Sequence, residues 1–194
     1  MNRQRLKKAV KSTFLVVTSP LFLICHCSGL VAGKDHAFQA FSQLLSLIPG
    51  RIGVYFRAAF YRLACPNTSD EISVGFLTVF SHRDVTIEQG VYIGPQCNIG
   101  KCTIGRNSLL GSGVHILSGA NQHRFNDPSV PIQEQGGIYE KISIGEDCWL
   151  GNQALVMASL GNQSIVAAGS VVVKPGNPGD ILAGNPSRLI RNRF

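Results

Sequence analysis

The chain has 194 residues, of which 44% are hydrophobic and 15% charged, with 21 glycines and a formal net charge of +7. This length is enough for one domain with a sizeable core, and the absence of a Gly-X-Y repeat or a long polar tract excludes collagen and wholesale disorder. Five basic residues lie in the first twelve positions, and the rest of the chain is nearly neutral. No nucleic-acid partner is expected, because binding to nucleic acid requires basic residues on the folded domain.

The first predicted element is an uncharged apolar segment at residues 13–33, which is about long enough to cross a bilayer. Pro20 interrupts it near the middle. Its basic flank favours retention of the amino terminus in the cytoplasm. A cleaved signal peptide is the alternative, since small residues at Ala32 and Gly33 follow the apolar run.

Two further apolar stretches follow at residues 36–50 and 51–63. Apolar residues at helical spacing in the first predict a helix. The second carries Arg51, Arg57 and Arg62 among aromatic residues, which suits an interfacial helix, although a helix packed on the protein's own core fits as well. We expect residues 1–71 to form a helical, membrane-associating region that meets the membrane surface through residues 1–63.

The cysteines form no CxxC pair and no cluster with histidines at zinc spacing. We interpret them as small buried apolar residues and expect a reducing compartment and no metal. The six are Cys25, Cys27, Cys65, Cys97, Cys102 and Cys148.

From residue 85 an aliphatic residue recurs at every sixth position, with two shorter steps. The positions are Ile87, Ile93, Ile99, Ile104, Leu110 and Ile116, then Ile144, Leu150, Val156, Leu160, Val166 and Val172. This period fits neither a 3.6-residue helix nor an alternating strand. It predicts a solenoid of short strands with aliphatic side chains in a stacked core and Gly or Asn at the corners, in roughly four coils.

These hexads, an aliphatic residue followed by Gly and four others, resemble those of the hexapeptide-repeat acyltransferases. Residues 149–194 are similar to the acetyl-coenzyme A-binding ends of sugar and antibiotic O-acetyltransferases in that family. The resemblance covers residues 72–194 and implies an all-β solenoid, a left-handed parallel β-helix. It also implies a homotrimer in which each of three sites is built from two adjacent subunits.

The hexads stop at residues 117–141, a polar, proline-bearing loop, and loops on a rigid scaffold commonly carry function. Removing the proton of an attacking hydroxyl suits a neutral imidazole near pH 7, and the loop contains His123. Residues 122–128 resemble the active-site loop of the polysaccharide branch, in which a histidine takes the hydroxyl proton. His123 is therefore our general base, and His115 is the competing candidate.

Asp127, Glu134 and Gln96 are candidates for contacts near this base. Asp127 or Glu134 could orient the imidazole through its second nitrogen, whereas Glu140 is less favoured. Gln96 matches a position where many acetyltransferases of this fold place Asn, and this departure leaves an acceptor contact from that coil open.

The resemblance also implies where acetyl-coenzyme A binds. Small residues would bond pantetheine, a lysine would approach the nucleotide phosphates, two arginines would add charge for the 3′-phosphate, and a tryptophan would line the groove. The matching residues are Trp149, Ala168, Gly169, Ser170, Lys174, Arg188 and Arg191.

We therefore expect direct acetyl transfer from acetyl-coenzyme A to a sugar hydroxyl of a surface-polysaccharide or lipid-linked (glycolipid) precursor, at the cytoplasmic face of a bacterial inner membrane. Because acetyl-coenzyme A is cytosolic, a re-entrant or paired insertion broken at Pro20 is preferred to one full span.

The alternatives are an acetyltransferase of a soluble antibiotic, serine or nucleotide sugar, a non-catalytic scaffold, and a γ-type zinc hydratase. The last needs three histidine ligands, for which His82, His115 and His123 are badly placed.

Overall fold

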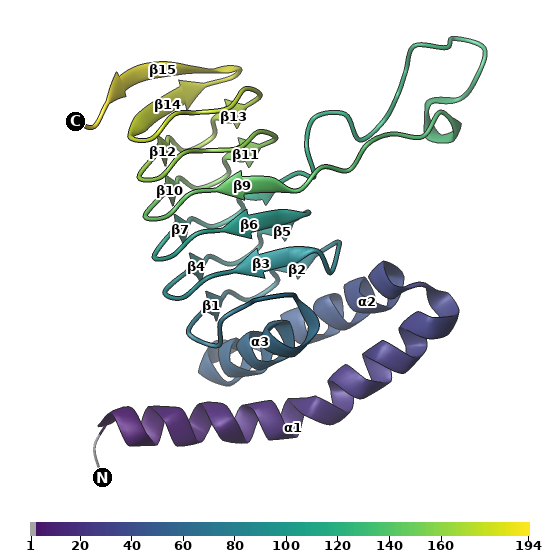
Figure 1. Ribbon diagram of the computed structural model, residues 1–194, viewed down its shortest axis with the longest axis vertical. Helices are drawn as coiled ribbons and strands as arrows, with labels where there is room; N and C mark the ends of the chain where they lie inside the picture. The colour runs from purple at the N-terminus through teal and green to yellow at the C-terminus, as the bar shows by residue number, and fades with distance from the viewer. Residues whose placement is uncertain (1–2) are drawn as a thin grey trace.

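The computed structural model describes residues 3–194. Three helices, α1 (Arg3–Ala32), α2 (Lys34–Ser46) and α3 (Gly50–Ala64), lie below a stack of short parallel strands (Figure 1). The change from helix to strand falls between Ala64 and Ser73.

The strands wind into three sheets, one for each side of the coil. The first sheet contains β1 (Ser73–Val74), β4 (Tyr92–Ile93), β7 (Leu109–Leu110), β10 (Trp149–Leu150), β12 (Ile165–Val166), β14 (Asp180–Gly184) and β15 (Ser187–Asn192). The second contains β2 (Val79–Phe80), β5 (Asn98–Ile99), β8 (His115–Ile116), β11 (Leu155–Val156) and β13 (Val171–Val172). The third contains β3 (Val85–Ile87), β6 (Cys102–Ile104) and β9 (Ile142–Ile144), and bridges from Ile144 to Leu160 and from Leu160 to Gly176 extend it.

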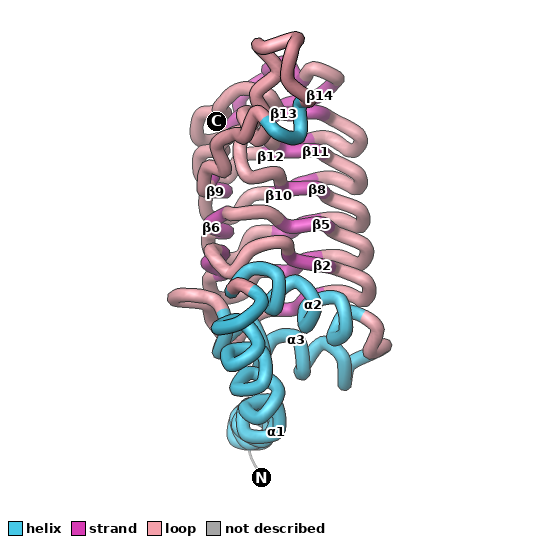
Figure 2. The backbone as a smooth tube through the Cα atoms, turned by 90° about the vertical axis from the view of Figure 1, so that its right-hand side faces the viewer, coloured by secondary structure: helices cyan, strands magenta, loops and turns pink. Residues whose placement is uncertain are grey.

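Neighbouring strands in each sheet are parallel, and Figure 2 shows the coils stacked above α2 and α3. The last pair, β14 and β15, is antiparallel and closes the far end of the stack. The solenoid that the sequence predicts is confirmed.

The aliphatic residue of every predicted hexad is buried, from Ile87 to Val172. They stack in register, so that in the first sheet Ile93, Leu110, Leu150 and Val166 form one inward column. Each fully buried aliphatic side chain contributes about 1.5–3 kcal/mol. The six-residue spacing therefore marks the core.

The stack also contains a coil that begins before residue 85, at Ser73, and is formed by β1, β2 and β3. Its inward residues Val74 and Phe80 keep the six-residue spacing and are fully buried. An aromatic residue fills the second position, which is why a search for repeated Ile, Leu or Val misses this coil.

The helices α2 and α3 cover the open lower end of the solenoid, where a core and unpaired strand edges would otherwise meet water. The buried Tyr61 ring lies 4.2 Å from that of Phe80, centroid to centroid. The Ser42 hydroxyl lies 2.8 Å from the Tyr61 hydroxyl and accepts a hydrogen bond from the Phe80 amide. These two helices thus pack on the protein's own core.

Arg57 is fully buried at this junction, so of the two interpretations left open for this helix, packing on the protein's own core is the correct one. Its guanidinium donates to the carbonyls of Val74, Leu45 and Ile48 at 2.8–3.0 Å. The carboxyl end of a helix leaves carbonyls without helical partners, and Arg57 donates to two of them at the end of α2, those of Leu45 and Ile48. Burial lowers the pKa of the Arg57 guanidinium.

The helix α1 crosses beneath α2 and α3 and continues through Pro20, where the sequence predicted a break (Figure 1). A proline removes one helical hydrogen bond and bends the axis. Leu21 and Phe22 pack against the core directly after it, and this packing holds the helix together across the lost bond.

Two lysines attach the first half of α1 to the solenoid. Lys11 and Lys7 both pair with the Glu71 carboxylate, Lys7 at 2.5 Å, and these bonds lower the pKa of Glu71. Phe14 stacks on Tyr55 of α3 with ring centroids 5.1 Å apart. The helix is therefore held by charge and by aromatic packing.

Replacing the buried arginine tests its role at the junction. Arg57→Met leaves three carbonyls without a charged donor and should lower the free energy of unfolding by about 3 kcal/mol or more. Arg62→Met, at an exposed position of the same helix, should change it by no more than about 0.5 kcal/mol. Urea denaturation measures both, and equal effects would contradict the assignment.

The Glu71 ion pairs predict a pH dependence. Because the folded pKa of Glu71 is lowered, its contribution is complete above the ordinary value of about 4.3 and is lost as the pH falls through the lower folded value. Glu71→Gln should lower the melting temperature at pH 7 and flatten its fall at acidic pH. Parallel melting curves for the two proteins between pH 3 and 7 would rule this out.

Candidate active site

The polar loop at residues 117–141 leaves the solenoid at the corner between the second and third sheets, after β8 and before β9. In Figure 1 it extends away from the stack on the right. Its stem is closed by backbone bonds from Arg124 to Gly136, from Ile138 to Asn121 and from Glu140 to Ser118, at 2.8–2.9 Å. A short helical turn, Ile132–Glu134, lies near its tip. The stem is thus fixed to two strands of the rigid stack.

His123 lies in this stem and is exposed. Its ring meets that of Tyr139 edge to face, with centroids 6.5 Å apart. Tyr139 in turn lies 5.5 Å from the ring of His82, on the corner of the first coil. The tyrosine ring therefore lies between the two histidine rings.

His82 is held by the Ser81 hydroxyl, 2.9 Å from its Nδ1, and burial lowers the pKa of the His82 imidazole. Neither His82 nor Tyr139 was among the predicted site residues. The coil stacking that joins them has no signal in the sequence, although a tyrosine at the end of a polar loop is a weak one.

The carboxylates of the loop are used differently from one another. Asp127 accepts hydrogen bonds from the amide and hydroxyl of Ser129, and these bonds lower the pKa of Asp127. Asp127 therefore shapes the loop tip. Glu134 lies in the helical turn, and the Glu140 side chain covers Gly119 at the stem.

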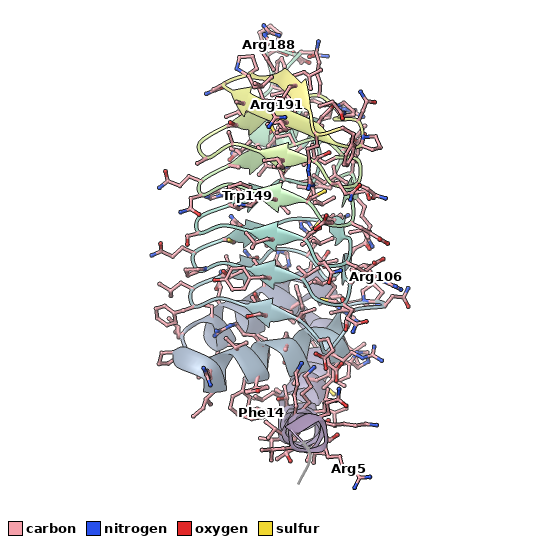
Figure 3. All side chains as sticks on the ribbon, turned by 90° about the vertical axis from the view of Figure 1, so that its left-hand side faces the viewer. Arg5, Phe14, Arg106, Trp149, Arg188 and Arg191 are labelled. Carbon is pink, nitrogen blue, oxygen red and sulfur yellow. The ribbon has the colours of Figure 1, made fainter. Side chains whose placement is uncertain are left out.

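Trp149 lies on the outer face of the first sheet, in register with Leu109 and Ile165, and is 53% exposed. Figure 3 shows this face with Arg188 and Arg191 above Trp149, near the closed end of the stack. Both arginines belong to β15 and are exposed. In Figure 1 the strands of this sheet lie on the side opposite the loop.

The remaining predicted residues lie at corners of the coils. Gln96 is exposed in the left-handed conformation, with φ 60°, and Ala168 and Gly169 are exposed at the same corner nearer the far end. Ser170 is buried, and its hydroxyl accepts from the Gly184 amide at 3.1 Å, so it joins two coils. Lys174 is exposed at the next corner.

A single chain therefore does not gather the predicted residues into one pocket. His123 belongs to the loop side, whereas Trp149, Arg188 and Arg191 belong to the first sheet. His115, the competing base, points outward from the second sheet. Within residues 3–194, no three His, Cys, Asp or Glu side chains are grouped so that they could hold a metal ion.

Two hexapeptide family models match parts of the chain. Bacterial transferase hexapeptide (six repeats) matches residues 84–118, and the hexapeptide repeat of succinyl-transferase matches residues 141–174. The matches lie on either side of the loop and coincide with the observed coils. The chain therefore contains hexapeptide repeats on both sides of the loop.

Its relatives include acetyltransferases. A probable macrolide acetyltransferase of Lysinibacillus sphaericus is 32% identical over 114 residues, which is 53% of this chain and 63% of the relative. A chloramphenicol acetyltransferase of Klebsiella aerogenes is 29% identical over 113 residues, 50% of this chain and 54% of the relative. The carnitine operon protein CaiE of Escherichia coli (strain K12) is 34% identical over 119 residues, which is 56% of this chain and 59% of the relative. The chain thus spans less than two thirds of these relatives.

Solved structures share the fold. A maltose O-acetyltransferase from Clostridium difficile 630 has a TM-score of 0.70 at 19% identity and covers 81% of this chain and 87% of its own. A hexapeptide-repeat acetyltransferase from Vibrio cholerae, complexed with acetyl coenzyme A, has a TM-score of 0.69 at 19% identity. The match covers 86% of this chain and 92% of that one.

The loop stem provides a test that does not depend on activity. A Cβ at Gly137 would lie 1.8 Å from the Gln122 carbonyl oxygen, so Gly137→Ala must open the stem and should speed tryptic cleavage after Arg124 at least tenfold. Gly136→Ala meets no atom within 4 Å and incurs only the strain of its positive φ. It should have a much smaller effect on cleavage. Equal cleavage of the two variants would contradict the closure of the stem by these backbone hydrogen bonds.

Proposed function

We propose that this protein is an acetyl-coenzyme A-dependent O-acetyltransferase that acetylates a sugar hydroxyl of a surface-polysaccharide or lipid-linked precursor. The observation that carries the proposal is the position of His123. It lies in the loop that interrupts the hexads, in the stem that backbone hydrogen bonds close. Its ring lies beside that of Tyr139 and is exposed, so that an acceptor could reach it.

His123 acts as the general base. A ring nitrogen accepts the hydroxyl proton while the oxygen attacks the thioester carbonyl, and the departing coenzyme A thiolate takes up that proton. The chemistry needs no acetyl-enzyme. Tyr139 limits the motion of the imidazole, which favours one attacking geometry.

The site is shared between subunits of a homotrimer. Support comes from the separation, in one protomer, of His123 from Trp149 and the arginines of β15. An adjacent subunit would bring its first sheet to the loop. The exposed backbone at Ala168 and Gly169 would then bond pantetheine.

The cationic residues of the last coils would bind the phosphates of the same molecule. Lys174 would meet the nucleotide phosphates, and Arg188 and Arg191 the 3′-phosphate, since guanidinium groups bind phosphate in bidentate fashion. All three side chains are exposed.

The protein associates with the cytoplasmic face of the inner membrane in this proposal. The apolar helix α1 supports it. Within residues 3–194, the helical stretch Gln4–Ala32 is long and apolar enough to cross a bilayer, by length and composition alone. Its most apolar window has a mean hydropathy of 2.0 and is only 17% buried. A membrane location would bring the loop to a lipid-linked acceptor.

A second candidate function is acetylation of a soluble antibiotic. The names of the macrolide and chloramphenicol acetyltransferase relatives favour it. Turnover with those antibiotics, but with neither saccharides nor lipid-linked saccharides, would select this alternative.

Substituting the two histidines tests the proposed base. His123→Ala should lower kcat about 100-fold to 10,000-fold, because general base catalysis is lost, whereas His115→Ala should stay within a few-fold of the parent protein. Release of the coenzyme A thiol with saccharide acceptors measures both. Intact turnover in His123→Ala with loss of turnover in His115→Ala would overturn the assignment.

The substrate class is tested in the cell. Mass spectrometry of surface polysaccharides with and without the gene should reveal one lost acetyl group.

A further inference from the structure

The helix α1 has two faces that repeat every seven residues. The inward face contains Lys11, Thr18 and Cys25, all buried. The outward face carries exposed aliphatic side chains, since residues seven apart lie on one side of a helix. These are Val16, Val17, Leu23, Ile24, Leu30 and Val31, exposed by between 52% and 93%.

The outward face is uncharged over residues 13–31, a length of about 27 Å at 1.5 Å per residue. A continuous apolar surface of this size is uncommon on a soluble monomer and marks a contact with another apolar phase or molecule.

The inward face is attached along the whole helix. Near the start, Lys11 pairs with Glu71. Near the end, Gly29 fits closely against α2, where an added Cβ would lie 3.3 Å from the Lys34 Cα and 3.7 Å from the Ala37 Cβ. A spanning helix is surrounded by lipid or by other spanning segments, so crossing a bilayer over residues 13–33 would strip the close contact between Gly29 and α2. One face of α1 remains for lipid, and both of its ends stay beside the protein.

Charge identifies the kind of surface. Residues 1–71 contain nine Lys and Arg against three Asp and Glu, whereas residues 72–194 contain nine against eight. Arg5, Lys8, Lys34 and Arg51 are exposed in the helical part, and Figure 3 shows Arg5 at the end of the molecule away from Arg188. Basic residues beside an apolar helical face attract anionic phospholipid.

We propose that α1 lies in the plane of an anionic phospholipid bilayer, with its outward aliphatic face in the membrane interface and the solenoid standing upright above it. This inference rests on the proposed membrane association and not on the chemistry of His123. It replaces both a single span and a re-entrant insertion.

Vesicle binding by the full chain tests the docking face. The protein should float with phosphatidylglycerol–phosphatidylcholine vesicles and much less with phosphatidylcholine alone. Leu23→Glu with Leu30→Glu should weaken partitioning at least tenfold. The matched control, Leu189→Glu with Ile190→Glu, changes residues of similar exposure (58% and 62%, against 58% and 69%) at the far end of the molecule and should bind as the parent does. Equal binding of the two double variants, or none to anionic vesicles, would overturn the proposal.

The ends of α1 test its orientation. In a Cys27→Ser background, which removes the exposed native thiol, Arg5→Cys and Lys34→Cys should both react with an impermeant maleimide in inside-out vesicles and neither should react in spheroplasts. Reaction of one position from each side would establish a span and end the proposal. Both tests are independent of catalysis, so inactivity toward sugars would sink the proposed function and leave this inference standing.

Discussion

The stacking of one buried aliphatic side chain per hexad is the interaction on which the rest of the structure depends. Most strands contain only two residues, too few to be stable alone, so each coil is ordered by the coils on either side. Such a stack must be closed at both ends. Here α2 and α3 close the lower end with aromatic residues and Arg57, and the antiparallel β14–β15 pair closes the upper end.

A scaffold of this kind fixes where chemistry can occur. Outward positions alternate with inward ones along every strand, so they form flat faces, and a side chain can project far from the stack only where the repeat is interrupted. The loop at residues 117–141 is that interruption, and the register of β8 with β11 and of β9 with β6 anchors both of its ends. The scaffold therefore sets the position of His123, and in the proposed homotrimer its further neighbours would come from another subunit's face.

The sequence was sufficient for the periodic part of the fold and for the limits of the loop, because both follow from residue spacing. It was insufficient where a contact joins coils or helices distant along the chain. Arg57 could not be assigned to the membrane interface or to the core, because nothing in the sequence locates the carbonyls to which it donates. Pro20 suggested a break because the packing of Leu21 and Phe22 is tertiary, and the His82–Tyr139–His123 contact depends on stacking. The placement of the cofactor residues stays a prediction for the same reason.

The proposed upright orientation on a membrane would constrain the acceptor. The loop leaves the third coil, and the first coil stands on α2 and α3, which rest on α1. With coils about 4.8 Å apart and packed helices about 10 Å apart, the loop base lies roughly 30 Å above the lipid-facing side of α1. A sugar joined directly to a lipid phosphate would remain near the interface and below the loop. If α1 lies on the membrane as proposed, the arrangement would suit a saccharide of several units on its lipid carrier, whose outer residues reach the height of His123.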